Sequence, residues 1–279
     1  MVQSLHLLLS YACSRECSHC FVWGGPSGPT MNRSQVHKLV DAAAREGMES
    51  VAFEGGEPFL QFDLLRYGVQ RTGALGLRAS VVTNAMWANS LTETIARLEA
   101  LVGEGPIDLM ISTDAFHGGT ESARCTSLLL KSARALGIEP AVARTGFDNV
   151  MFRGRATHTL AHLVEGRPWC AFDSCPHENL LNPSRVHVDA AGFVHLCQGL
   201  AAGRFDDNLG HLCSGDSLKR HPVVGKLARG GPARLVREYG LDLHDLYADA
   251  CHLCYEARKL LRGRFAGYLG PDRMYGVFK

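Results

Sequence analysis

Three cysteines stand close together near the start of the chain, Cys13, Cys17 and Cys20, with the spacing C-x3-C-x2-C. Three thiolates on one short loop can ligate three irons of a [4Fe–4S] cube, and the fourth iron then keeps an open coordination site. A zinc site and a redox thiol pair are the alternatives, and His19, inside the loop, could compete as a zinc ligand. The spacing favours the iron–sulfur cluster.

The chain holds ten cysteines, and most of the others fall in its last 110 residues. A chain of 279 residues without an export signal is not a small disulfide scaffold. In a reducing compartment, clustered thiols bind metal or do redox chemistry. Cys125, in an expected helix, and Cys213, in an expected loop, are interpreted as buried or spare.

The overall composition limits the kinds of partner. The formal net charge is +1 and 46% of residues are apolar, so the chain lacks the basic footprint of a nucleic-acid or membrane-surface protein. Its apolar runs are far too short for a membrane span, and the N-terminus lacks the basic region of a signal peptide. We expect a cytoplasmic protein that binds neither nucleic acid nor membrane.

The first half of the chain alternates strand-like and helix-like segments. Strands are expected at residues 4–10, 50–53, 79–83, 108–112 and 140–144, with helices at 31–47, 60–72, 90–101 and 121–136. This alternation predicts βα units around a parallel sheet, with a sixth strand near residues 147–152. The fold class is therefore α/β, a partial (β/α)6 TIM-like barrel.

The pattern changes after about residue 165. Two short strands, 185–188 and 193–196, flank the turn 189–192 and predict a β-hairpin. Helices follow, and Cys251 and Cys254 enter the last one. We therefore divide the chain into a partial barrel, residues 1–165, and a small C-terminal α/β domain, residues 166–279.

Polar motifs follow consecutive strands behind the cysteine motif. They are Gly55-Gly56-Glu57 after the second strand, Thr83-Asn84 after the third, Ser112-Thr113-Asp114 after the fourth, and Arg153-Gly154-Arg155-Ala156. The carboxyl ends of parallel strands converge, so these residues can line one site. Taken singly, each motif is also an ordinary turn or cap. Together, over residues 5–156, the set resembles the radical S-adenosylmethionine (SAM) superfamily.

The resemblance implies cofactor contacts for these positions. Gly55, Gly56 and Glu57 would bind the amino group of SAM, with the Glu57 carboxylate as the anion. Thr83, Asn84, Ser112 and Asp114 would complete the SAM site, the last two near the ribose, and His19 fills a position where the family places an aromatic ring. Ala85 departs from the pattern, because the family has glycine there.

The second cysteine group resembles the auxiliary-cluster domain called twitch, a smaller relative of the SPASM domain. That resemblance implies a second [4Fe–4S] cluster on Cys175, Cys197, Cys251 and Cys254. Cys170 is the rival for the first position, and a structural zinc on the same thiolates is the alternative.

The implied activity is reductive cleavage of SAM to a 5′-deoxyadenosyl radical, which abstracts a substrate hydrogen. An auxiliary cluster as electron acceptor favours oxidation of, or bond formation on, a small metabolite. The alternative is crosslinking or epimerisation of a ribosomally made peptide. Because the barrel begins by residue 4, we expect no N-terminal leader-binding domain. This expectation slightly favours a metabolite as the substrate. An iron–sulfur electron carrier or a zinc-binding module is the non-enzyme alternative.

Two further residues are candidates for catalysis, and one partner is implied. His117 stands near the barrel mouth and can donate a proton, and Arg144, at the end of the fifth strand, can bind an anion. A structural histidine and a salt-bridged arginine are the alternatives. The resemblance also implies an external one-electron donor of the flavodoxin or ferredoxin type.

Overall fold

The computed structural model describes residues 2–206 and 208–278. Within them, one sheet runs through the middle of the molecule, with strands β1 (Ser4–Ser10), β2 (Ser50–Gly55), β3 (Arg78–Thr83), β4 (Ile107–Ser112), β5 (Ala141–Ala143), β7 (Arg185–Val188), β8 (Phe193–Cys197) and β9 (Leu200–Arg204). Their order is β5-β4-β3-β2-β1-β7-β8-β9. In this order, each neighbouring pair from β5 through β1 to β7 is parallel. The pairs β7–β8 and β8–β9 are antiparallel.

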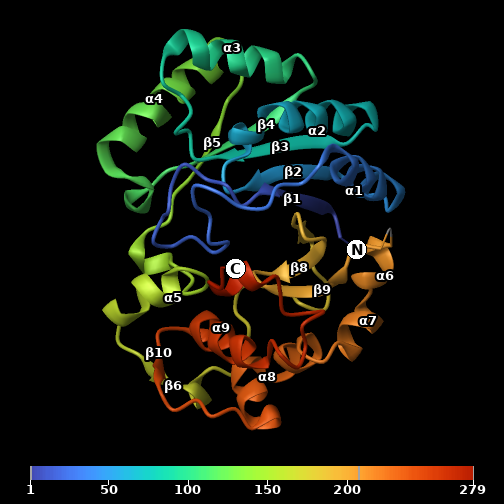
Figure 1. Ribbon diagram of the computed structural model, residues 1–279, viewed down its shortest axis with the longest axis vertical. Coiled ribbons are helices and arrows are strands. Elements are labelled where there is room, and N and C mark those ends of the chain that lie inside the picture. The colour runs from blue at the N-terminus through green and yellow to red at the C-terminus, as the bar shows by residue number, and fades with distance from the viewer. Residues whose placement is uncertain (1, 207, 279) are drawn as a thin grey trace.

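The first four parallel strands are connected by helices, as the alternation predicts. These are α1 (Arg33–Arg45), α2 (Phe62–Ala74), α3 (Leu91–Val102) and α4 (Gly119–Ala135), which follow β1, β2, β3 and β4. They lie together on one side of the sheet (Figure 1). Strand and helix together form the βα units of an open α/β barrel.

Helix α1 shows how local sequence fixes such an element. Asn32 Oδ1 accepts a hydrogen bond from the Gln35 N–H, and Gln35 Oε1 accepts one from the Asn32 N–H, a reciprocal capping box. The helix buries Val36, Leu39 and Val40 on one face. Gly47, just past its end, has φ +68°, a left-handed conformation that favours glycine.

The prediction of a sixth strand near residues 147–152 is wrong. A 3-10 helix, η3 (Phe147–Asn149), lies there, and the Gly146 N–H donates to Asn149 Oδ1. This local bond gives the backbone an alternative to strand pairing. The sixth parallel position is instead taken by β7 at the other side of the sheet, beside β1.

The expected hairpin is present as β7 and β8, and its first strand extends the barrel sheet. Ser4–Leu7 of β1 pair in register with Arg185–Val188 of β7. The main hydrophobic core is also continuous, since it includes Leu5 of β1, Val186 of β7 and Leu227 further along the chain. The division of the chain at residue 165 stays a prediction, and the sheet crosses it.

The remaining α-helices cover the side of the sheet away from α1–α4 (Figure 1). The helices are α5 (Ala156–Thr159), α6 (Leu209–Leu212), α7 (Gly215–Arg220), α8 (Val224–Tyr239) and α9 (Ala250–Leu261), and β6 (Arg167–Pro168) pairs with β10 (Leu246–Tyr247). The other 3-10 helices are η1 (Pro58–Gln61), η2 (Ala115–His117), η4 (Ala161–Leu163), η5 (Trp169–Ala171) and η6 (Asp272–Tyr275). As expected, Cys251 and Cys254 lie on the last α-helix.

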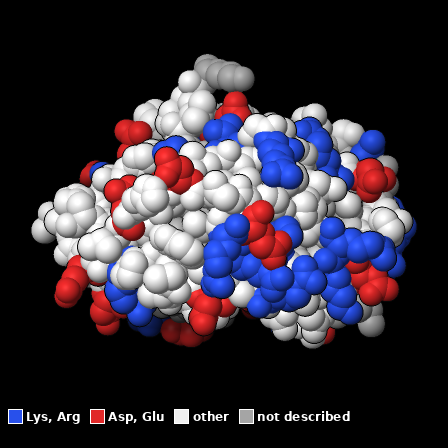
Figure 2. Space-filling model, turned by 90° about the horizontal axis from the view of Figure 1, so that it is seen from below, with Lys and Arg blue, Asp and Glu red and all other residues white. Residues whose placement is uncertain are grey.

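Two surface properties complete the description. Among the described residues, no helix combines the length and the apolar character that a membrane crossing requires. Charge is unevenly distributed: seen from below, Lys and Arg side chains gather over one half of the face (Figure 2).

Candidate functional site

The three N-terminal cysteines lie in a loop that is tied to the end of β1. The Cys13 N–H donates to Gly25 O (2.6 Å), and the Cys20 N–H donates to Cys17 O (3.1 Å). All three cysteines line one cavity of about 150 Å³. Cys13 is buried, and burial raises the pKa of its thiol to about 12 in the absence of a metal.

The glycine pair after β2 lets this loop approach closely. Gly55 has φ +137°, and a Cβ on Gly56 would stand 2.1 Å from Ala12 O. The Gly56 N–H donates to Ser10 O (2.6 Å) and the Glu57 N–H donates to Ala12 O (2.9 Å). Gly55 and Gly56 both line the cysteine cavity, as the sequence predicts.

The Glu57 carboxylate is held by the neighbouring turns and does not line the cavity, and its contact with SAM stays a prediction. Its Oε1 accepts from the Phe59 N–H (3.1 Å) and the Thr83 hydroxyl (2.8 Å), and its Oε2 accepts from the Asn84 N–H (2.8 Å). Burial raises its pKa to about 7, although these hydrogen bonds favour the charge. Glu57 therefore joins the turns after β2 and β3, and the cavity lining contains the two glycines without it.

Thr83 and Asn84 lie at the cavity as expected. Asn84 Nδ2 donates to Cys13 Sγ (3.3 Å), so it contacts the first thiol directly. Ala85, which stands where the family has glycine, has φ +64° and is fully buried. Ala85 is therefore left-handed at a turn where glycine would adopt that conformation most easily.

The residues after β4 are divided between the cavity and its support. Ser112, His117 and His19 line the cavity. The Asp114 carboxylate instead accepts from the backbone N–H groups of Phe116 (2.9 Å) and Thr145 (3.1 Å), and His117 Nδ1 lies 2.8 Å from its Oδ1. Asp114 thus orients His117, and its expected ribose contact stays a prediction.

The other catalytic candidate, Arg144, is exposed and does not line this cavity. A different arginine contacts the cysteine loop. Arg155 Nη1 donates to Cys17 O (2.9 Å) and Nη2 to Gly24 O (2.6 Å), while its backbone N–H donates to Cys20 O (2.9 Å). Only the motif Arg153–Ala156 drew attention to this residue, without indicating that it holds the loop.

The four C-terminal cysteines also meet in one place. Cys175, Cys197, Cys251 and Cys254 line a small cavity of about 20 Å³. Cys170 is exposed and lies outside it, and Cys125 and Cys213 are buried elsewhere. The structure thus brings Cys175 together with Cys197, Cys251 and Cys254, and Cys170 lies apart from them.

Two arginines accompany these thiols: Arg153, half-buried, from the Arg153–Ala156 motif, and Arg258, buried, which the sequence reasoning missed. Arg153 Nη1 donates to Cys197 Sγ (3.1 Å), and Arg258 Nε donates to Cys254 O (3.2 Å). Both line the thiol cavity. A guanidinium donor is suited to thiolates or sulfides that carry net negative charge.

The spacing of the thiols bears on the kind of metal. Among the described residues, no three metal-ligating atoms within 4.8 Å of one another include more than one cysteine sulfur. A tetrahedral zinc, with Zn–S near 2.3 Å, needs its thiolates only about 3.8 Å apart. A four-iron cube places each thiolate on a different iron, and the thiolates are then farther apart. The donor set fits a cluster at both positions.

A third cavity, of about 230 Å³, lies between the two thiol sets. It shares Leu8, Phe21 and Glu54 with the first cavity, and Arg153 and Cys197 with the second. The order in space is therefore first thiols, central cavity, second thiols. We call this third cavity the central cavity.

A polar cluster that the sequence reasoning missed lines the central cavity. His6 of β1 and His187 of β7 are paired in register, and both contact Glu54 of β2. Glu54 lies 2.5 Å from His187 Nδ1 and 3.3 Å from His6 Nδ1. Although burial acts against it, the two histidines hold the pKa of Glu54 well below its usual range.

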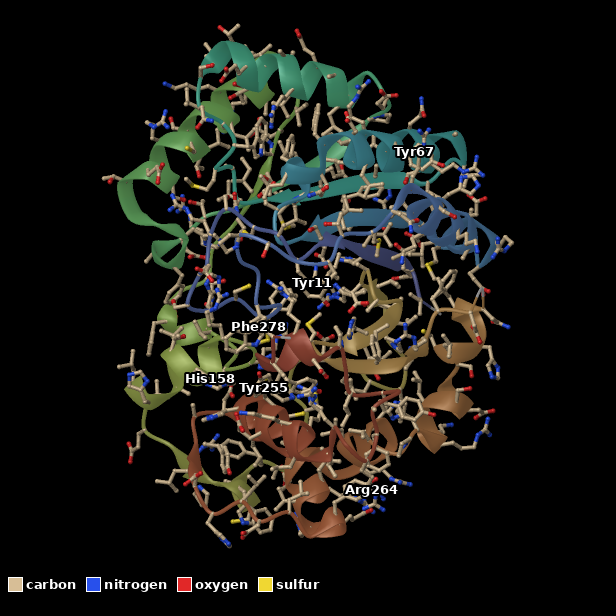
Figure 3. All side chains as sticks on the ribbon, in the orientation of Figure 1. Tyr11, Tyr67, His158, Tyr255, Arg264 and Phe278 are labelled. Carbon is tan, nitrogen blue, oxygen red and sulfur yellow. The ribbon has the colours of Figure 1, made fainter. Side chains whose placement is uncertain are left out.

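One buried network ties the cysteine loop to the hairpin. Tyr11, just before the loop, lies at the centre of the molecule (Figure 3) and donates its hydroxyl to Asp189 Oδ2 (2.7 Å). His195 Nε2 lies 3.0 Å from the same oxygen, and Asp189 Oδ1 accepts from the turn N–H groups of Ala191 and Phe193. Loop and hairpin are thereby held in one position.

Comparison with known proteins identifies the first part of the chain. Residues 7–140 match the radical SAM superfamily. Residues 7–140 form a radical SAM domain. Members of this superfamily use a [4Fe–4S] cluster and SAM, and the three thiols beside the glycine pair fit both groups.

Individual relatives are distant. The curated "Putative peptide biosynthesis protein YydG" of Bacillus subtilis (strain 168) is 22% identical over 134 residues, which are 47% of this chain and 42% of that protein. The crystal structure of BtrN in complex with AdoMet (SAM) and 2-DOIA is 16% identical with a TM-score of 0.50, covering 73% of this chain and 78% of that one. The structure of anSMEcpe with bound AdoMet and Cp18Cys peptide is 14% identical with a TM-score of 0.44, covering 94% and 97%. The likeness to BtrN shows the fold, a partial barrel, alone.

Proposed function

We propose that the chain is an enzyme that binds a small metabolite in the central cavity. It would oxidise this substrate by dehydrogenation or by bond formation. Cys13, Cys17 and Cys20 would hold the [4Fe–4S] cluster that binds SAM, and Cys175, Cys197, Cys251 and Cys254 a second cluster. The observation that carries the proposal is the position of the central cavity, which shares lining residues with both thiol sets.

When bound, the first cluster and SAM supply a 5′-deoxyadenosyl radical that removes a substrate hydrogen atom, and the second cluster takes up the electron that a two-electron oxidation leaves. The chain's own residues position these groups and exclude water. Gly55 and Gly56 allow close approach to the cysteine loop, and Asn84 and Arg155 hold that loop by its sulfur and carbonyl groups. His187 and His6, held by Glu54, can accept the proton that an oxidised hydroxyl or amine releases.

Modification of a ribosomally made peptide, by crosslinking or epimerisation, is the second candidate. The name of the distant relative YydG favours it. A central cavity of about 230 Å³ suits a small metabolite or a single side chain of a peptide. Reduced enzyme with SAM is incubated first with a pool of metabolites and then with a pool of peptides. Only one of the two pools should raise the rate of 5′-deoxyadenosine formation above the rate without substrate.

Iron analysis tests the two clusters. Anaerobically reconstituted protein should contain two cubes, and a Cys13/Cys17/Cys20 triple-Ala variant should keep about four irons. Cys254→Ala should lose the second cube, whereas Cys170→Ala should keep it. Zinc in the triple variant would refute the electron-acceptor role, and loss of iron from Cys170→Ala, with Cys175→Ala unaffected, would shift the ligand set by five residues.

A further inference from the structure

One stretch of the chain concentrates positive charge. Residues 219–237 contain six Lys and Arg residues and no Asp or Glu, in a chain whose formal net charge is only +1. The stretch covers the end of α7 and nearly all of α8. A local excess of this kind does not show in the net charge of the whole chain.

Half of these six side chains have no acidic partner in the described part of the chain. Arg220, Arg229 and Arg237 are exposed, and no carboxylate of the described residues lies within salt-bridge distance of them. Lys219 pairs with Asp216 (3.8 Å), and Lys226 and Arg234 share one partner, Glu238. Positive charge is therefore in excess on this surface.

A further arginine joins the stretch from another part of the chain. Arg264 lies at the lower edge of the molecule (Figure 3), with its guanidinium 4.9 Å from the ring centre of Tyr239, the last residue of α8. Lys226 Nζ approaches the same ring at 5.4 Å. We call the following seven residues the basic face: Lys219, Arg220, Lys226, Arg229, Arg234, Arg237 and Arg264. Figure 2 shows such a gathering of Lys and Arg on one half of the lower face.

The opposite side of α8 lines the second thiol cavity. Leu227 and Pro232 of this helix are buried there, next to Cys175 and Cys254. The helix kinks at Gly231, which has φ +57°, and a Cβ on that residue would stand 2.3 Å from Ser174 N. The kink therefore brings α8 against the segment before Cys175. A single helix separates the thiols from the basic face.

We propose that the basic face is the docking surface for an acidic one-electron carrier protein, which exchanges electrons with the second cluster through α8. The inference rests on the proposed second cluster. Each exchange moves one electron between carrier and cluster, and no bond is made or broken. Nucleic acid and anionic membrane also match the charge, but only an electron carrier makes use of a surface so close to the thiols.

A purified bacterial flavodoxin, an acidic protein, is the probe. Its binding to the anaerobic holoenzyme should weaken at high ionic strength. Arg220→Glu/Arg229→Glu should weaken binding by about tenfold or more. The matched control is Arg45→Glu/Lys131→Glu, which makes the same charge change at exposed positions of α1 and α4 and should leave binding unchanged.

Several results would contradict the proposal that the basic face is a docking surface for an electron carrier. They are absence of flavodoxin binding, equal loss in both double variants, and binding of an RNA oligomer or of phosphatidylglycerol vesicles to the basic face in place of flavodoxin. Iron analysis of the same samples separates this failure from that of the proposed function. If only one cluster is present while flavodoxin still binds the basic face, the second cluster is refuted and the docking surface alone stands.

Discussion

Glu57 belongs to a motif and also has a structural role. The resemblance implies that it binds SAM as an anion, which stays a prediction, and in the structure its oxygens accept hydrogen bonds from Phe59, Thr83 and Asn84. A buried carboxylate that accepts three hydrogen bonds fixes two turns relative to each other. Since Asn84 contacts Cys13, this arrangement also positions a cluster ligand.

The raised pKa of Glu57 makes a prediction about pH. Because its folded pKa, about 7, exceeds the unfolded value of 4.5, the folded state holds the proton more tightly. This contribution to stability is complete below pH 4.5 and is lost as the pH rises through 7, by up to about 3 kcal/mol. In urea unfolding, wild type should lose stability relative to the non-titrating Glu57→Gln over that interval. A constant difference between the two proteins would contradict the raised pKa.

At the scale of elements, His221 caps α8. Its Nδ1 accepts from the N–H groups of Val223 (3.1 Å) and Val224 (3.0 Å), and its Nε2 donates to Ala201 O (2.9 Å) on β9. Only neutral imidazole with the proton on Nε2 can make these three bonds. The same helix carries most of the basic face and lines the thiol cavity, so its start is fixed by one side chain.

Acid should therefore loosen α8. Burial lowers the pKa of His221 to about 4, from 6.5. For a depressed histidine, the contribution to stability is present above pH 6.5 and is lost as the pH falls towards 4, by up to about 3 kcal/mol. His221→Asn keeps a capping oxygen without titrating, so the advantage of wild type in urea unfolding should shrink on acidification. An advantage that persists at pH 4 would show that the cap is not pH-sensitive.

At the scale of the whole molecule, the sheet makes the two predicted parts interdependent. Strand β7, which follows the boundary at residue 165, pairs with β1 and covers its edge. Leu5 and Leu7 of β1 are completely buried. Removing the second part would expose an unpaired strand edge and apolar surface, which promote aggregation.

We therefore expect that a fragment of residues 1–165 does not fold alone. Circular dichroism should show less ordered structure per residue than in the full chain, and size exclusion should show aggregates. The full chain should unfold in one transition, because its core is shared. A monomeric 1–165 fragment that binds about four irons would show that the two parts are independent.

The sequence by itself determined the chemistry that depends on local spacing. Cys13, Cys17 and Cys20 lie within eight residues, and the alternation of short strands and helices fixes the parallel sheet and brings Gly55, Asn84 and Ser112 to one cavity. The hairpin of β7 and β8 was also predictable, because Gly192 allows its turn with φ +81°.

Only the tertiary structure decided which distant residues meet. His6 and His187 are paired because β7, rather than a strand near residue 150, takes the place beside β1, and strand pairing over such a separation has no local sequence pattern. Arg153 and Arg155 looked like parts of one motif, yet one contacts Cys197 and the other Cys17 O. Gly154, between them, has φ +60°, and Arg155 has helical backbone angles, so the chain turns there and sends the two side chains to different neighbours.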